Sequence, residues 1–172
     1  MKNRIQNLAF NRLFKRVKEK RRSANPYKLE EAKHIGIIWN MDDPDAPKSI
    51  QKIINELKRP GCFIHTLAFS RKANVTEKQS IHNIILTPKN TSWTGKPKEQ
   101  EAEEFINTSF DILIDLSIKH EFSLIYALAM NNSRFKLTCN SEHYEFADLF
   151  IQAPNKSILD IYDLMKEYVS KF

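Results

Sequence analysis

Glycine is scarce in this sequence, and its scarcity narrows the classes of protein that the chain can belong to. Of 172 residues, three are glycine: Gly36, Gly61 and Gly95. Dinucleotide-binding turns and Walker loops need several glycines, because the backbone there approaches phosphate closely. The segment where such a turn would stand, NMDDPDAPKS (residues 40–49), has none. We therefore expect no bound nucleotide cofactor, and no other cofactor is indicated.

Cysteine is almost as rare, with Cys62 and Cys139 as its two occurrences. Both lie in apolar runs, so we expect buried free thiols, as in a reducing cytoplasm. Neither has zinc-binding spacing, the five histidines form no ligand motif, and no nucleophile elbow occurs. No run approaches the roughly 20 apolar residues of a membrane span, and no apolar stretch of a secretory signal follows the basic N-terminus. We expect a cytoplasmic protein.

Positive charge is concentrated at the N-terminus. Residues 1–22 contain nine Lys and Arg residues against one Glu, a net charge of +8, whereas the whole chain carries +6. The rest of the chain therefore carries −2, so a faintly acidic body bears a strongly basic arm. This asymmetry indicates a polyanionic partner.

The basic arm has the periodicity of an amphipathic helix. Its apolar stripe consists of Ile5, Leu8, Ala9, Leu13 and Val17, and Phe10 and Phe14 widen it. Most of the charges lie on the opposite side. The helix should end before SANPY (residues 23–27), because Pro26 cannot continue it. We predict a basic helical arm over residues 1–25 and a single α/β domain over residues 26–172.

Short apolar runs alternate with helical patterns in the body. The expected strands are residues 34–39, 62–69, 81–87, 110–117, 134–139 and 146–152. The expected helices begin near residues 46, 99, 121 and 157. Nearly continuous apolar strands are typical of a parallel sheet that is buried on both faces. We predict a doubly wound sheet of five or six mostly parallel strands with helices on both faces; one edge strand could be antiparallel.

An acidic cluster follows the first expected strand. Asp42, Asp43 and Asp45 lie where ligands bind in open α/β sheets, and Asp115 joins them if its strand is adjacent. Such carboxylates could hold Mg²⁺. The competing and favoured interpretation is that the three aspartates cap the next helix, with Pro47 in its first turn. His120 beside Glu121 is a weaker acid–base candidate.

The loop SWTGKP (residues 92–97) is a second candidate site. Trp93 could stack on a nucleic-acid base, and Gly95 with Lys96 could meet a phosphate. The favoured alternative is a tryptophan that folds back over its own loop.

These segments carry a resemblance to a known family. SWTGKP, FDILIDLS, FKLTCN and ADLFI together resemble a small cytoplasmic α/β family of unknown function from Bacteroidetes-type bacteria. The likeness runs from about Lys33 to Ala153 and implies the fold without an activity. FDILIDLS also faintly resembles the N-terminal domain of heptosyltransferase-like glycosyltransferases, which need a second nucleotide-binding domain.

The arm dominates the functional interpretation. We predict a non-catalytic protein that binds RNA through clustered basic residues and interleaved aromatics, with ribosomal RNA as the first choice of target. The predicted RNA-binding residues are Arg4, Phe10, Arg12, Phe14, Lys15, Arg16, Lys18, Lys20, Arg21, Arg22, Trp93 and Lys96. Three alternatives stay open: an anionic membrane surface, a Mg²⁺-dependent phosphate enzyme at Asp42, Asp43 and Asp115, and an arm that docks on the body with its charges merely solvated. No small-molecule ligand is indicated.

Overall fold

Strands and helices alternate along the chain as the hydrophobic pattern predicts. The structure, a computed structural model, describes residues 12, 14, 15, 25–72 and 83–172. The strands are β1 (His34–Asn40), β2 (Phe63–Phe69), β3 (Asn83–Leu86), β4 (Ile112–Asp115), β5 (Phe135–Thr138) and β6 (Leu149–Phe150). The α-helices are α2 (Ala46–Leu57), α3 (Gln100–Asn107), α4 (Phe122–Met130) and α5 (Ile158–Val169), and a 3₁₀ turn spans Tyr144–Phe146. Arg12, Phe14 and Lys15 are helical; the rest of the predicted basic helix lies outside the described residues.

All six strands run parallel in one sheet with the order β3-β2-β1-β4-β5-β6. The doubly wound α/β class is therefore confirmed, and the possible antiparallel edge is wrong. At one edge β3 pairs parallel with β2, and at the other β6 pairs parallel with β5 through Leu137–Leu149 and Thr138–Phe150. Neither edge strand is reached by a tight hairpin, which is the connection that antiparallel neighbours share.

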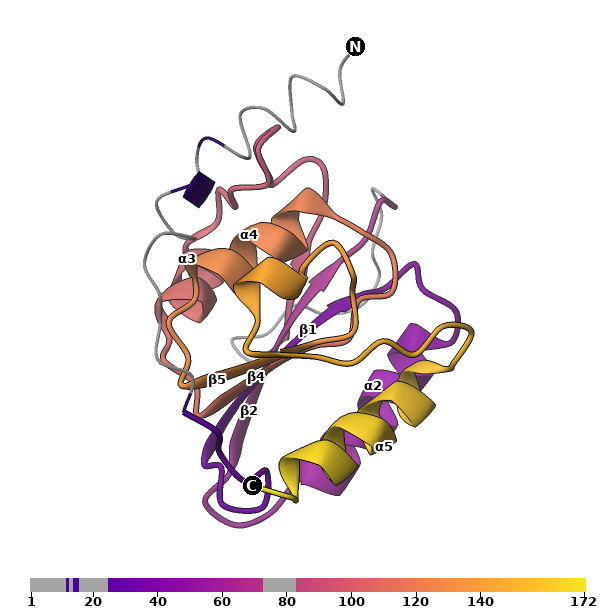
Figure 1. Cartoon of the computed structure of the whole chain (residues 1–172). Helices are drawn as coiled ribbons and strands as arrows, with labels where there is room; N and C mark the ends of the chain where they lie inside the picture. Colours follow the sequence, from indigo (N-terminus) through magenta and orange to yellow (C-terminus); the bar gives the residue numbers. More distant parts are fainter. Residues whose placement is uncertain (1–11, 13, 16–24, 73–82) are drawn as a thin grey trace.

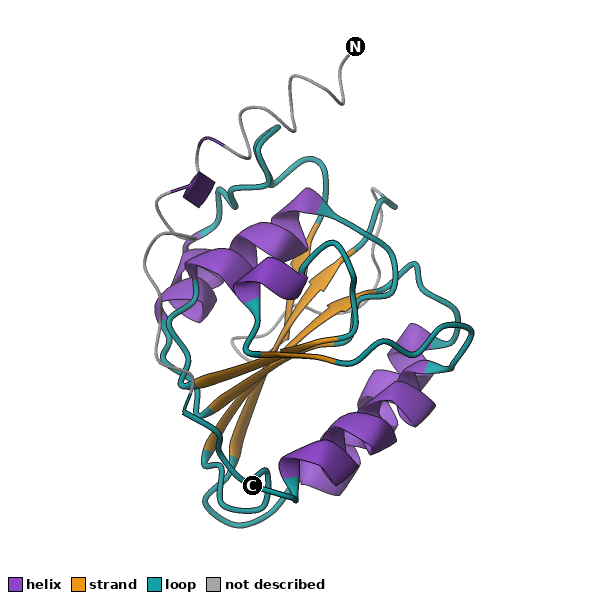
Figure 2. Ribbon diagram, in the orientation of Figure 1, coloured by secondary structure: helices purple, strands orange, loops and turns teal. Residues whose placement is uncertain are grey.

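Helices cover both faces of the sheet. Helices α2 and α5 lie side by side on one face, and α3 and α4 lie on the other (Figures 1 and 2). Successive residues of β1 serve the two faces in turn: Ile35, Ile37 and Trp39 belong to the core under α2 and α5, and Ile38 belongs to the core under α3 and α4. Burial on both faces explains why the strands are apolar throughout.

Gly36 is needed for close packing on the α3–α4 face. A Cβ atom at this position would lie 2.7 Å from both Phe110 and Leu113. The missing side chain leaves the space that the Phe110 ring fills, and Phe110 is fully buried.

The two cysteines are free as expected, but both are partly rather than fully buried.

The strand order reverses between β1 and β4, which brings Asp115 beside the acidic cluster that follows β1. The chain leaves β1 in one direction to form β2 and β3, and returns to the other side of β1 to form β4, β5 and β6. Ile38 of β1 is paired with Asp115 of β4, so the condition for Asp115 to lie beside the acidic cluster is met. Ligands of open α/β sheets bind at this point, beyond the carboxyl ends of the strands.

Candidate functional site

Two aspartates in the turn between β1 and α2 hold the neighbouring turns together. The Asp42 carboxylate accepts hydrogen bonds from Ser70 Oγ at 3.2 Å and from the backbone N–H of Arg71 at 2.9 Å. The Asp43 carboxylate accepts the backbone N–H groups of residues 118 and 119, at 2.7 and 3.1 Å. Burial raises the pKa of Asp43, although these N–H groups oppose the shift. Both carboxylates are thus committed to the turns that follow β2 and β4.

Asp115 is the most buried carboxylate at this edge. Its side chain is 0% exposed and accepts hydrogen bonds from the Ser117 backbone N–H and hydroxyl, from Thr138 Oγ1 at 2.8 Å and from His143 Nδ1 at 2.6 Å. Burial alone would raise the pKa of Asp115, but His143, with the hydroxyls of Ser117 and Thr138, reverses the effect and lowers it. A charged Asp115 therefore links β4 to β5 and to the loop beyond β5.

His143 and His120 extend this network toward the surface. The two rings lie 5.8 Å apart, and His120 Nδ1 lies 3.2 Å from the exposed Glu142 carboxylate. Burial lowers the pKa of His120, which opposes the pull of Glu142. An Asp–His pair is a common acid–base arrangement, but His143 is 0% exposed and no substrate reaches it in this conformation. The pair is therefore a structural link, and His120 beside Glu121 is not a built catalytic site, because Glu121 is paired with Arg71 at 2.6 Å.

The metal alternative does not fit this geometry. A Mg²⁺ site needs carboxylate oxygens that face a common point and are open to a cation. Both oxygens of Asp43 accept backbone N–H groups, and those of Asp115 accept hydroxyls and an imidazole. Over residues 25–72 and 83–172, no group of three or more His, Cys, Asp or Glu side chains could hold a metal ion.

The capping interpretation of the acidic cluster also needs correction. Asp45 occupies the N-cap position of α2, and Pro47 stands in the first turn as expected, but the Asp45 side chain makes no cap hydrogen bond. Its φ of 54° places it in the left-handed region, where a side chain cannot reach back to the first turn as a cap normally does. The role of Asp45 in this turn therefore lies in its left-handed backbone conformation, which aspartate adopts more readily than most residues do.

The loop of residues 92–97 packs against the start of α4. Gly95 has a φ of 86°, and a Cβ there would overlap the backbone carbonyl of Phe122. Trp93 is 61% exposed, so the expected fold-back of this side chain over the loop leaves most of its surface open. Lys96 lies at the surface, 3.6 Å from Glu103. The loop that bears the exposed indole therefore packs on the start of α4, and its lysine pairs with a glutamate of α3.

The described part of the basic arm meets the same helix. Phe14 is 0% exposed, and its ring lies 5.8 Å from that of Tyr126 in α4 and 5.4 Å from that of Phe146. Arg12 and Lys15, on either side of it, are exposed. Phe14 therefore anchors the arm in the core and is not exposed for base stacking. The other predicted arm residues lie outside the described residues: Arg4, Phe10, Arg16, Lys18, Lys20, Arg21 and Arg22.

Sequence patterns miss the partners of the buried carboxylates. Thr138 and His143 lie 23 and 28 residues from Asp115, and nothing in their local sequence marks them. A signal was present in Asp115 itself, because a carboxylate at the end of an apolar strand needs buried donors from neighbouring strands.

The chain belongs to a family of unknown function, DUF6913, whose model matches residues 2–172. The predicted kinship with an uncharacterised α/β family is thereby confirmed, whereas the Bacteroidetes origin and the heptosyltransferase likeness stay predictions. No curated protein and no solved structure matches the chain. In the part of the chain that the structure describes, no helix is long and apolar enough to cross a membrane.

Proposed function

We propose that this protein binds RNA on the ribosome through its basic N-terminal arm, without catalysing a reaction. The charge asymmetry motivates the proposal: +8 over residues 1–22 against −2 over the rest of the chain. A charge density of this kind is self-repelling in a free helix, and phosphate relieves the repulsion by displacing counterions. The observation that carries the proposal is the position of Phe14 between two exposed cations.

The burial of Phe14 gives the arm a defined direction. On a helix, Arg12 and Lys15 lie about 60° apart, and Phe14 lies on another side. With Phe14 held against α4, the two cations face away from the core, where both are exposed. The spacing in the sequence predicts that Arg16 shares their face. An anchored basic face of this kind binds phosphates with less loss of conformational freedom than a free arm would.

The loop of residues 92–97 supplies a second element of the proposed surface. Gly95 packs on Phe122, and Phe14 packs on Tyr126, one turn further along α4. Phe14, which anchors the basic face, and the loop that bears Trp93 and Lys96 therefore both pack on α4. Basic groups that follow a phosphate backbone, combined with an exposed ring on which a base can stack, are the usual elements of sequence-tolerant single-strand binding.

The arm's charges can be tested without disturbing its anchor. We expect that changing Arg12, Lys15, Arg16 and Lys18 to Gln, with Phe14 kept, weakens binding to a labelled single-stranded RNA. The slope of log K against log salt should flatten by about three units, since each phosphate contact contributes about 0.7. A matched control removes four exposed lysines of the body: Lys48, Lys52, Lys72 and Lys156.

The control variant should bind with the salt slope of the original chain. Equal slopes for all three proteins would overturn the proposal, and so would the absence of any RNA binding by the intact protein. Flotation with anionic liposomes, tested at the same salt concentrations, separates the membrane alternative: binding to vesicles but not to RNA would assign the arm to lipid.

A further inference from the structure

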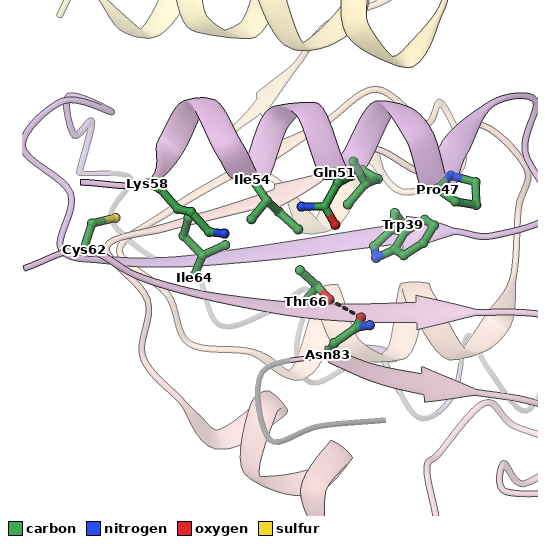
Figure 3. Close-up of a pocket in the computed structure, with 10 residues that line it drawn as sticks. Trp39, Pro47, Gln51, Ile54, Lys58, Cys62, Ile64, Thr66 and Asn83 are labelled. Atoms are coloured by element: carbon green, nitrogen blue, oxygen red, sulfur yellow. Dashed lines mark hydrogen bonds between the residues drawn. The ribbon is translucent and has the colours of Figure 1, made fainter. Parts of the chain in front are cut away.

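A groove lies between α2 and strands β1 to β3, on the face of the sheet that is opposite Phe14 (Figure 3). It encloses about 480 Å³, within the range of small-molecule sites. Its walls are mainly apolar: Pro47 and Ile54 come from the helix, Ile64 from β2, and the indole ring of Trp39 from β1. The proposed RNA-binding surface contributes no residue to it.

A buried donor without an acceptor faces this groove. Trp39 is 3% exposed, and its Nε1–H has no hydrogen-bond partner among the described residues. Figure 3 shows the indole nitrogen turned into the cavity, with the polar ends of Gln51, Thr66 and Asn83 around the same space. Thr66 Oγ1 donates to Asn83 Oδ1 at 2.6 Å, which leaves the Asn83 amide NH₂ as a second donor there. An unpaired buried N–H is costly, and an acceptor on a ligand would remove that cost.

A cation stands at the other end of the groove. Lys58, just past the C-terminus of α2, lines the cavity and is exposed, and none of the ion pairs between described residues involves it. From Pro47 to Lys58 the chain rises by about 16 Å at 1.5 Å per helical residue. The groove is thus elongated and apolar along its middle, with hydrogen-bond donors at the Trp39 end and a positive charge at the Lys58 end.

We propose that this groove binds an elongated, mostly apolar organic acid. Its carboxylate pairs with Lys58, its chain or ring lies between Ile54 and Ile64, and a neutral acceptor such as a carbonyl oxygen accepts the Trp39 Nε1–H. The carboxylate belongs at the exposed Lys58 end, because an anion placed beside the buried indole would lose its hydration without gaining a counter-charge. The proposal does not depend on RNA binding, so a negative result for one leaves the other unaffected.

The test uses the full chain with Trp93→Phe, which leaves Trp39 as the single tryptophan and hence a reporter inside the groove. The probe is monomethyl decanedioate, which has one carboxylate, an apolar chain and an ester carbonyl at the far end. We expect a saturable change in Trp39 fluorescence. Dimethyl decanedioate, which lacks the charge, should bind at least roughly tenfold more weakly, and undecanoate, which lacks the carbonyl, roughly threefold to tenfold more weakly.

Lys58→Gln should reduce the affinity for the monoester to that for the diester, whereas Lys52→Gln, within α2 but outside the groove, should leave both affinities unchanged. Both lysines are exposed, so neither variant threatens folding. Three results would overturn the proposal: no saturable fluorescence change at millimolar probe, equal affinity for the monoester and the diester, or a preference for the monoester that survives Lys58→Gln.

Discussion

Replacing Asp115 with Ala should remove a large part of the protein's stability. Four donors lose their acceptor: the backbone N–H and the hydroxyl of Ser117, the hydroxyl of Thr138 and Nδ1 of His143. All three residues are 0% exposed, so water does not replace the carboxylate without rearrangement. At about 1–3 kcal/mol for each unsatisfied buried donor, the four donors together would cost about 4–12 kcal/mol. Hydroxyls that rotate to other acceptors recover part of this cost, so we expect a loss of about 4 kcal/mol.

Urea unfolding at neutral pH, followed by circular dichroism, measures this loss. Asp163→Ala is the matched control, because Asp163 lies on the surface of α5 and pairs with Lys166 at 3.2 Å, a contact worth at most about 1 kcal/mol. A free energy of unfolding for Asp115→Ala within 1 kcal/mol of the original value would refute the view that this carboxylate organises the edge of the sheet.

The pH dependence gives an independent check of the same site. The pKa of Asp115 in the folded state lies below its ordinary value of 3.8. Its contribution to stability is therefore fully present above pH 3.8 and is lost as the pH falls through the lowered folded-state pKa. Asp115→Asn, which keeps the size of the side chain, should lose less stability on acidification over this window than the original chain does. An equal acid sensitivity of the two proteins would contradict this assignment.

Three further substitutions test neighbouring parts of the account. Phe14→Ala should cost about 3 kcal/mol by removing a buried ring from the core under α4, measured by urea unfolding; an unchanged midpoint would show that the arm is not anchored there. Gly95→Ala should lower the melting temperature, because a Cβ at a φ of 86° also overlaps the Phe122 carbonyl; tolerance would mean that the loop lies elsewhere. Asp45→Asn should change the free energy of unfolding by less than about 0.5 kcal/mol, since no side-chain cap is lost and Asn accepts the left-handed conformation; a loss of about 1 kcal/mol would restore the capping interpretation.

The order and type of the main elements were predictable, because strands that are buried on both faces appear in the sequence as nearly continuous apolar runs. Runs such as HIGIIW and FDILIDLS are mostly apolar, because both faces of these strands meet a layer of helices. The final strand was overestimated: residues 146–152 were expected, but β6 is confined to Leu149–Phe150 because Tyr144–Phe146 forms a 3₁₀ turn. That difference depends on how the loop after β5 packs, which local secondary-structure propensity does not predict.

The position of the acidic cluster at the carboxyl ends of the strands was predictable, but the hydrogen-bond partners of its carboxylates were not. Proximity of Asp115 to the first turn follows from strand order, and the sequence favoured a sheet in which the two strands could be neighbours. The donors that occupy Asp43, however, are backbone N–H groups about 75 residues away. Such contacts depend on tertiary structure alone. The same holds for Phe14, whose place in an apolar stripe was predictable but whose buried position against Tyr126 was not.

Co-sedimentation with ribosomes tests the central claim most directly. The intact protein, the arm variant with Gln at positions 12, 15, 16 and 18, and the body-lysine control are each expressed in the native cell, and lysates are sedimented with and without nuclease. We expect the intact protein and the control to travel with ribosomes until nuclease releases them, and the arm variant to stay near the top of the gradient. An arm variant that sediments with ribosomes as fully as the intact protein, or an intact protein that never does, would contradict the account.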